Sequence, residues 1–337
     1  MHSIHINIRR FCVILVGLVF YISGMFKLMD PVGTGLIVKE YLRFFHLSGL
    51  APAAKAFGIL LAWTETQCGV YMICGLARRL MSYVVLAMVS CFTAITLILL
   101  IFNPSMDCGC FGEAIHLSHW QSLIKNIVLL AVAVVGFVPI RSGQRPRKAK
   151  FIIGNIVSAS VMAFAIMGVR ELPVVDFTEY SPGSEDFSLN YSSAEGEYTA
   201  SVEPEGKVFI VSVYEPERFS WEEWEEVSLL FSDALLAGME PLLLTTDVSG
   251  VPDDLTDYAY VADYKQLITL NRSNGGSTYI CDGMIVDKWT RHAPCTSDEM
   301  EALVTGNPIE TAVNGVIHGR IFLEALLIGS VVAMLLL

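Results

Sequence analysis

Six long apolar runs constrain the fold of this chain more than any other feature of its sequence. A helix needs about 20 mainly apolar residues to cross a bilayer, so the first five runs predict membrane-spanning helices. The last belongs to an apolar helix predicted over 316–337, which either crosses the membrane or lies against the other helices. With 53% hydrophobic and 17% charged residues, the chain is not a soluble enzyme. The runs are 11–29, 53–77, 80–102, 120–140, 151–169 and 321–337.

The first run has the basic start and apolar centre of a signal peptide. No small-x-small cleavage pattern follows it, so we expect a retained first span. In the next segment, 31–50, apolar residues such as Tyr41 and Leu42 recur at helical spacing beside charged ones. This pattern predicts a short amphipathic helix on the membrane surface.

Basic residues at three places predict the topology. Arg9 with Arg10, Arg78 with Arg79, and the cluster within 141–150 all fall on one side if each run crosses once. The positive-inside rule assigns that side to the cytoplasm. We therefore expect the loop 107–119 and the region 170–315 to lie outside the cytoplasm.

The acidic residues belong to one polar region. The net charge is -12, and 28 of the 34 acidic residues lie within 171–310. A basic surface patch is the usual footprint of nucleic-acid binding, and this region has none. We therefore expect lipid around the apolar runs and no nucleic-acid partner.

The polar region alternates between strand and helix patterns after a Ser-, Gly- and Glu-rich linker with an edge strand, 171–206. Ser220 with Glu223, and Thr296 with Glu299, have the spacing of capping boxes. The predicted order is that of an α/β domain: strand 208–213, helix 220–237, strand 241–245, helix 263–270, hairpin 278–289 and helix 297–304.

Cys108 and Cys110 stand in a glycine-flanked loop between two apolar runs. A disulfide between cysteines two residues apart closes a small strained ring, which favours exchange and predicts a redox pair. Two alternatives stay open. One is a permanent structural bridge, for example to Cys295; the second is a metal site in which His116 and His119 supply two further ligands.

Glu65 lies about ten residues into the second run, where an unpaired carboxylate is costly. Lys27 and Lys125, nearer the outer edge, are its candidate partners. One interpretation is a polar pocket for a quinone head group or a proton path. The other is a structural ion pair that fixes the register of the helices.

The remaining cysteines have simpler predictions. Those inside apolar runs act as small hydrophobic residues, and Cys281 belongs to the core of the α/β domain. Cys295 precedes a helix N-terminus, which favours a thiolate. Whether Cys281 and Cys295 form a disulfide stays open. The cysteines inside the runs are Cys12, Cys68, Cys74 and Cys91.

Residues 11–140 resemble the DoxX-like four-helix membrane proteins, especially the methylamine-utilisation branch, MauE. The residues that carry the resemblance are Gly24, Lys27, Asp30, Pro31, Glu65, Gly69, Gly75 and the string Cys108-Gly109-Cys110-Phe111-Gly112. Residues 207–304 resemble a thioredoxin-fold domain, as found fused to DoxX-type proteins in Bacteroidetes.

These resemblances imply a modular membrane protein. The expected parts are a DoxX/MauE-like four-helix membrane domain (1–140), a basic cytoplasmic loop and fifth transmembrane helix (141–170), a linker (171–206), a thioredoxin-like domain (207–306) and the C-terminal apolar helix (316–337). The expected location is the bacterial inner membrane, with a cytoplasmic N-terminus and a periplasmic α/β domain.

The implied function is extracytoplasmic thiol-disulfide chemistry, with an exported thiol-containing client or an oxidoreductase as partner. The thioredoxin-like domain departs from its family, because Tyr214 to Arg218 replace Cys-x-x-Cys and Asn274-Gly275-Gly276 replace the cis-proline segment. We expect a catalytically silent docking domain. The alternative function is a non-enzymatic membrane adaptor that uses this domain for docking.

Overall fold

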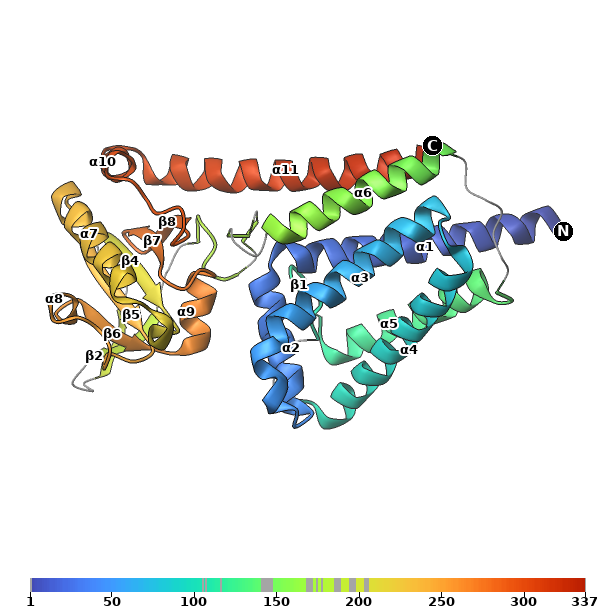
Figure 1. Ribbon diagram of the computed structural model, residues 1–337, viewed down its shortest axis with the longest axis horizontal. Helices are drawn as coiled ribbons and strands as arrows, with labels where there is room; N and C mark the ends of the chain where they lie inside the picture. The colour runs from blue at the N-terminus through green and yellow to red at the C-terminus, as the bar shows by residue number, and fades with distance from the viewer. Residues whose placement is uncertain are drawn as a thin grey trace. The chain divides into compact units, whose positions relative to one another are not determined.

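The chain forms two compact units (Figure 1). Residues 1–169 with 324–337 make up the helical unit, and residues 170–323 make up the sheet unit. The computed structural model describes residues 2–104, 106, 108–115, 117–140, 148–167, 172–173, 175–176, 178–184, 189–193, 198–202 and 206–336.

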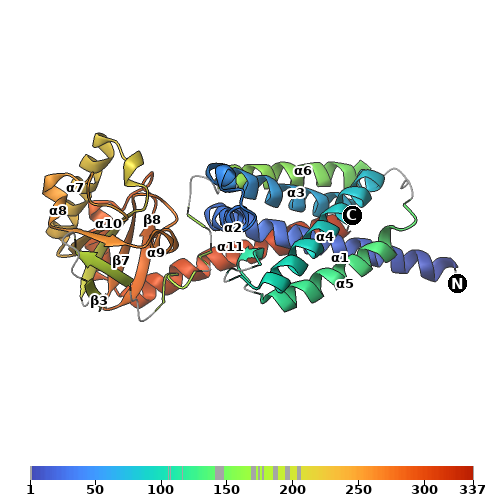
Figure 2. The same ribbon diagram turned by 90° about the horizontal axis from the view of Figure 1, so that it is seen from below.

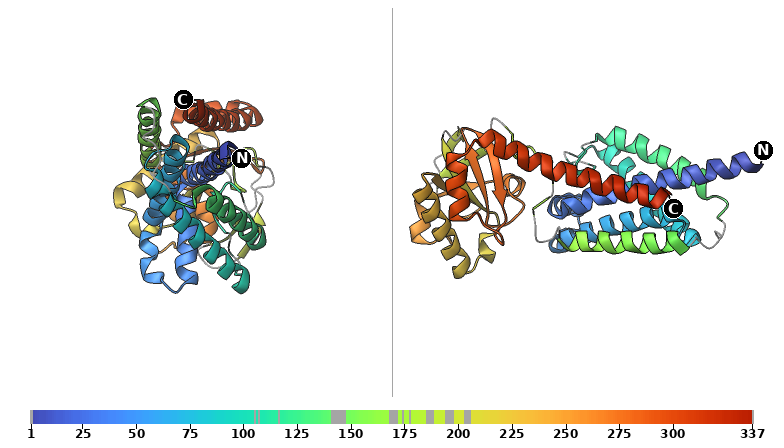
Figure 3. Two further views of the ribbon diagram at one scale, coloured as in Figure 1. Left: turned by 90° about the vertical axis from the view of Figure 1, so that its right-hand side faces the viewer. Right: turned by 90° about the horizontal axis from the view of Figure 1, so that it is seen from above.

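The helical unit is a bundle built around two helices, α1 and α3. Helix α1 packs on α3 and α5, and α3 also packs on α2 and α6 (Figures 1 and 2). Helices α4 and α5 lie side by side, as the views of Figure 3 also show. The elements are α1 (His2–Met29), α2 (Pro31–Phe44), η1 (Ser48–Ala53), α3 (Ala54–Cys74), α4 (Arg78–Phe102), β1 (Cys110–Glu113), α5 (His119–Phe137), α6 (Lys148–Met167) and the end of α11 (Pro308–Leu336).

Four helices of the described residues are long and apolar enough to cross a membrane: Asn7–Met29 within α1, then α4, α5 and α11. They coincide with four of the six predicted spans, although α11 begins eight residues before the predicted 316. The other two predicted spans are occupied by α3 and α6, which are helices but not among these four.

Helix α3 is less apolar because it carries polar residues in its centre, and the bundle accommodates them. Glu65 and Thr66 are buried, with 1% and 0% exposure. Gln67 accepts a hydrogen bond from Ser158 of α6, with 2.6 Å between Oε1 and Oγ. Polar groups that face other helices need no lipid contact, so a low hydropathy does not exclude a crossing by α3. Its crossing, and that of α6, stay predictions.

Small residues let α1 and α3 approach closely. A Cβ added at Gly24 would overlap the Thr66 side chain, and one added at Gly69 would lie within 2.7 Å of Tyr21 Cα. Such contacts are typical of small residues where two membrane helices cross. The close approach brings the polar residues of the two helices within hydrogen-bonding distance.

Helix α2 confirms the predicted helix after the first span. Asp30 caps it, because its carboxylate accepts a hydrogen bond from the Gly33 amide at 2.8 Å, and Pro31 occupies the first turn. Thr34 and Ile37 are buried, so one face of α2 packs into the bundle. A position on the membrane surface stays a prediction.

The sheet unit contains a seven-stranded mixed sheet with the order β3-β2-β6-β5-β4-β7-β8. Strand β4 is parallel to β5 and antiparallel to β7, β5 is parallel to β6, and β7 and β8 form an antiparallel hairpin. The strands are β2 (Leu189–Ser193), β3 (Tyr198–Val202), β4 (Lys207–Val213), β5 (Glu240–Thr245), β6 (Ala259–Ala262), β7 (Gly276–Cys281) and β8 (Met284–Trp289).

Helices cover both faces of this sheet (Figure 1). Alternate residues of β4, such as Phe209 and Val211, share one apolar core with Phe231 of α7 and Met300 of α10. Helix α9 packs against β4 and β5, and Figure 1 draws it on the side of the sheet away from α7. The helices are η2 (Pro216–Arg218), α7 (Trp221–Ala237), α8 (Asp253–Thr256), α9 (Tyr264–Leu270) and α10 (Ser297–Thr305).

The strand and helix order predicted from the sequence is confirmed, including the two capping boxes. Asp282 and Gly283 turn the hairpin with φ angles of 47° and 78°, as the Asp-Gly pair predicts. Two features differ. The segment predicted to contain one edge strand contributes both β2 and β3, and the short elements α8 and β6 were not predicted.

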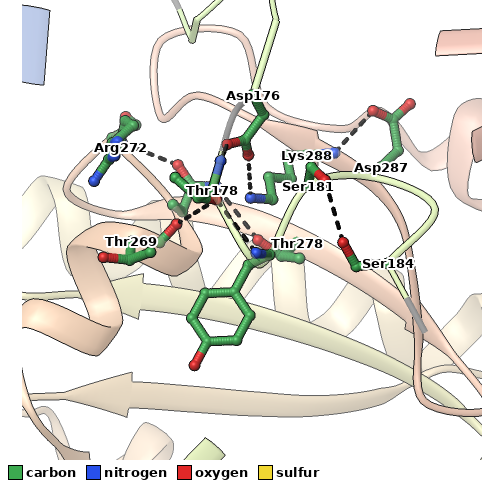
Figure 4. A network of polar contacts seen from close by, with 12 residues as sticks. Asp176, Thr178, Ser181, Ser184, Thr269, Arg272, Thr278, Asp287 and Lys288 are labelled. Carbon is green, nitrogen blue, oxygen red and sulfur yellow. Dashed lines mark hydrogen bonds and ion pairs between the residues drawn. The ribbon is translucent and has the colours of Figure 1, made fainter. Parts of the chain in front are cut away.

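A polar network joins the segment before β2 to the hairpin (Figure 4). Lys288 Nζ lies 2.6 Å from Asp176 Oδ2, and both side chains are largely buried. Thr178 donates its amide hydrogen to Asp176 Oδ1 at 2.9 Å. Burial works to raise the pKa of Asp176, but Lys288 and the Thr178 hydrogen bonds outweigh it and leave that pKa lowered.

Candidate functional site

A cavity of about 300 Å³ lies inside the helical unit. Side chains from α1 to α5 and from the loop that leads into β1 line it. It brings together all five residues that the sequence singled out as redox or pocket candidates: Lys27, Glu65, Cys108, Cys110 and Lys125.

Lys27 and Glu65 form a buried ion pair at the wall of this cavity. The Lys27 ammonium lies 2.7 Å from both carboxylate oxygens of Glu65, and the two side chains are 7% and 2% exposed. Of the two lysines considered as partners, Lys27 is therefore the one that pairs with Glu65. The pair neutralises both charges and satisfies the carboxylate with two charge-assisted hydrogen bonds.

Two hydroxyl groups attach the cysteine loop to the bundle. Ser23 Oγ lies 2.7 Å from the carbonyl oxygen of Cys110 and 2.9 Å from Glu65 Oε2, so its hydrogen can serve either acceptor. Tyr41 donates its hydroxyl hydrogen to the carbonyl oxygen of Cys108 at 2.7 Å. The backbone on both sides of Gly109 is thus held by α1 and α2.

Gly109 is required at the centre of the loop for two reasons. Its φ of 57° lies in the left-handed region, and a Cβ there would overlap the Ile37 side chain of α2. Glycine therefore allows the loop both to turn between the cysteines and to lie directly on α2.

The Cys108 thiol contacts an imidazole. Cys108 Sγ lies 3.4 Å from His119 Nδ1, and His119 Nε2 lies 3.0 Å from the carbonyl oxygen of Pro104. A carbonyl only accepts, so Nε2 carries a hydrogen, and in the neutral ring Nδ1 is the acceptor. The imidazole is therefore oriented to take the proton of the thiol. Cys108 is 5% exposed, whereas Cys110 is half-buried.

Lys125 enters the cavity from α5. Its ammonium lies 4.8 Å from the centre of the Phe111 ring, a cation–π distance. No carboxylate of the described residues lies within ion-pair distance of this ammonium. Lys125 thus differs from Lys27, whose charge is neutralised by Glu65.

The metal-site alternative gains no support within the described part of the chain, where no three His, Cys, Asp or Glu side chains form a metal-binding group. His119 contacts Cys108 instead, and His116 lies outside the described residues. All eight cysteines, each within the described residues, are thiols. The bridge considered between Cys281 and Cys295 is therefore absent from this structure.

The prediction for Cys295 was wrong. The thiol is buried, and burial together with the nearby carboxylates of Glu299 and Asp287 raises its pKa to about 12. A helix N-terminus does favour a thiolate. Here burial and the two carboxylates, one from α10 and one from β8, oppose it. Cys295 belongs to the core of the sheet unit, with Cys281 packed against that core.

Sequence reasoning missed three contributors to the site. Ser23 lies one helical turn before Lys27, which was a signal for a shared face. Tyr41 was assigned only to an amphipathic helix. His119 was considered as a metal ligand, whereas the structure makes it the hydrogen-bonding partner of Cys108.

In the sheet unit, the segment after β4 has hydrogen-bonded residues other than cysteine. Asn274 Oδ1 accepts hydrogen bonds from the amides of Tyr214 and Glu215 at 2.8 and 3.0 Å. Tyr214 is buried and donates its hydroxyl hydrogen to the carbonyl oxygen of Arg272 at 3.0 Å. The backbone there is thus bonded to its neighbours and carries no thiol.

The fold and the site define a helical membrane protein in which a thiol–imidazole pair lies beside a buried ion pair. Residues 6–139 match the model of the family described as methylamine utilisation protein MauE. The match and the apolar helices support a MauE-type membrane part, and the matched range contains every residue that lines the cavity. No curated protein and no solved structure matches the chain.

Proposed function

We propose that this MauE-type membrane protein carries out thiol-disulfide exchange with an exported client or oxidoreductase through Cys108 and Cys110. The observation that carries the proposal is the contact of the Cys108 thiol with His119 Nδ1, in the tautomer that Pro104 selects. A thiolate is the reactive form of cysteine, and an adjacent base supplies it.

The difference in burial assigns separate roles to the two cysteines. Cys110 is the more accessible sulfur and forms the mixed disulfide with the client. Cys108, buried against His119, is the leaving and resolving thiol. A cysteine that resolves within its own loop needs no access to a second protein.

The exchange balances as follows in the oxidising direction. A client thiolate attacks Cys110 Sγ of the Cys108–Cys110 disulfide, the S–S bond breaks, and Cys108 leaves with the electron pair. Protonated His119 returns a proton to Cys108 from Nδ1. The second client thiolate attacks the client sulfur of the mixed disulfide and expels Cys110 as a thiolate. The client loses two electrons and two thiol protons. One proton reaches Cys108 through His119, and the other protonates the Cys110 thiolate.

For the sheet unit we propose a degenerate thioredoxin-like domain that docks the partner. Its β4-α7-β5 unit, β7-β8 hairpin and final helix α10 have the order that such a domain requires. The bonded backbone at Tyr214 and Glu215 supports a role without catalysis. We place this unit in the periplasm and the N-terminus in the cytoplasm of a bacterial inner membrane, as the basic loops favour.

The two roles are tested by trapping mixed disulfides in cells. In the reverse of the exchange steps, Cys110 attacks a client disulfide and Cys108 resolves the mixed disulfide inside the loop. Cys108→Ser therefore accumulates client adducts on non-reducing gels. Cys110→Ser lacks the attacking sulfur and accumulates none. Cys91→Ser, which removes an exposed thiol of α4, is the matched control and leaves the adduct pattern of the parent protein.

The adaptor alternative predicts a different result. If the loop has no exchange chemistry, all three variants give the same pattern while still inserting into the membrane. That outcome would leave docking by the sheet unit as the function of the protein. Adducts that form with Cys110→Ser but not with Cys108→Ser would instead reverse the assigned roles.

A further inference from the structure

The walls of the cavity beside Cys108 are mainly apolar. Aromatic and aliphatic side chains from six elements form most of them, and polar side chains such as Lys27, Glu65 and Lys125 complete the lining. A volume of about 300 Å³ is at the lower end of the range for small-molecule sites. The apolar lining includes Phe20, Ile37, Leu61, Phe92, Phe111 and Leu129.

Most polar side chains at this cavity already donate their hydrogens to other groups of the protein. Lys27 directs its ammonium to Glu65 and Ser23, and Tyr41 donates to the carbonyl oxygen of Cys108. Asn126 donates to Thr96 Oγ1 at 3.3 Å and to the carbonyl oxygen of Phe92.

Lys125 is different. Within the described residues its ammonium has an aromatic ring as neighbour and no carboxylate. The cavity therefore offers apolar walls, one strong donor and an adjacent dithiol.

From these features we infer that the cavity binds a quinone, whose carbonyl oxygen accepts a hydrogen bond from Lys125 and which reoxidises Cys108 and Cys110. This inference rests on the proposed exchange function, because a pair that oxidises clients must pass two electrons onward. An acceptor that enters an apolar cavity within a membrane bundle is lipid-soluble, and a quinone takes two electrons.

The step balances without a further reactant. The S–H bonds of Cys108 and Cys110 break, and one S–S bond forms between them. The two electrons and two protons convert the two carbonyl groups of the quinone to hydroxyls. His119 accepts the Cys108 proton before it is passed on, as the 3.4 Å contact allows.

Binding is measured with full-length protein in lipid nanodiscs that carries Cys108→Ser and Cys110→Ser, so that no electron transfer occurs. The probe is decylubiquinone, titrated by calorimetry. We expect saturable binding, and Lys125→Ala weakens it about tenfold or more because a charge-assisted hydrogen bond is lost. Lys125→Arg keeps the donor and stays close to the parent. Lys148→Ala, an exposed lysine of α6 outside the cavity, is the matched control.

The absence of decylubiquinone binding, or binding that Lys125→Ala does not change, would overturn the inference. So would binding of oleate in its place with the same Lys125 dependence, which would define a site for anionic lipid. Turnover is then followed as quinol formation by the reduced parent protein, and its absence despite binding would also count against the inference.

The two proposals fail separately. If Cys108→Ser traps client adducts but decylubiquinone does not bind, the exchange function stands and the quinone site is wrong. If decylubiquinone binds in a Lys125-dependent way but no variant traps a client, the cavity is a quinone site without the proposed exchange. The role of the quinone as electron acceptor for Cys108 and Cys110 would then be rejected.

Discussion

The loop at Cys108 and the turn after β4 are the two places where the families that the chain resembles carry cysteines, and they are built in opposite ways. At Cys108 a thiol contacts an imidazole beside a cavity. After β4, the Asn274 amide group bonds the backbone of Tyr214 and Glu215, where no thiol is present.

The difference lies in which side chains the closely packed backbone holds at each place. Both places use a positive-φ glycine beside a packed side chain: Gly109 against Ile37, and Gly275 against Phe219. In the helical unit this close packing positions two cysteines. In the sheet unit it places Gly275, just before β7, against an aromatic ring.

The largest expected effect concerns the ion pair beside the cysteine loop. Lys27→Met leaves the buried Glu65 carboxylate without its partner, which we expect to destabilise the helical unit by about 3–5 kcal/mol. The double variant Lys27→Met with Glu65→Leu removes both charges and recovers most of that loss. Thermal unfolding of the purified variants in one detergent measures both values. A double variant as unstable as the single one would show that the pair itself, and not an orphaned charge, carries the stability.

The second effect separates a thiol that contacts an imidazole from one that does not. His119→Gln keeps a donor for the Pro104 carbonyl but removes the base at Nδ1, so iodoacetamide alkylation of Cys108 slows about 100-fold at neutral pH. Cys295, whose pKa is raised to about 12, stays almost unmodified in both proteins and serves as the internal control. Mass spectrometry of each peptide gives the rates, and an unchanged Cys108 rate would remove His119 from the site.

A smaller effect is expected at the turn after β4. Asn274→Ala leaves the amides of Tyr214 and Glu215 without their acceptor, at a cost of about 1–3 kcal/mol. Hydrogen exchange of the intact protein measures this locally as faster exchange in β4 and β7. Trapping of adducts at Cys110 stays unchanged, because this turn takes no part in the chemistry. Loss of trapping in a variant that still folds would contradict the assignment of a silent domain.

The smallest effect is a pH dependence of the sheet unit. Because the pKa of Asp176 is lowered in the folded state, its ion pair with Lys288 contributes stability above the unfolded pKa of about 4. That contribution is lost as the pH falls through the lower, folded pKa. Asp176→Asn removes this part of the acid dependence. Hydrogen exchange in β8 between about pH 5 and pH 2.5 tests it, and identical profiles for parent and variant would disprove it.

The sequence predicted elements with a clear period and end signals. The capping boxes at Ser220 and Thr296 and the Asp282-Gly283 turn are local signals, and the structure confirms them. Strand β6 is short and lacks a strong alternation, and the pairing of β2 with it depends on residues far apart in the chain. Such pairing has no local signal.

For the candidate site, too, local signals were predictable from the sequence and contacts between distant residues were not. Residue type was enough to select Cys108, Glu65 and Lys27, because thiols and charges are unusual beside apolar runs. The contact between Cys108 and His119 depends on how the loop turns at Gly109, so sequence reasoning missed it and considered His119 only as a metal ligand. The prediction for Cys295 failed because it used helix position and ignored burial and neighbouring carboxylates.

The redox state of Cys108 and Cys110 in intact cells tests the central claim most directly. Cells are quenched with acid, their thiols are tagged with a mass-adding maleimide, and Cys108→Ser and Cys110→Ser assign the bands. A working redox pair gives a mixture of reduced and oxidised protein that shifts on addition of a reductant. A pair that stays fully oxidised until the protein is denatured is a structural bridge, and it would contradict the exchange function.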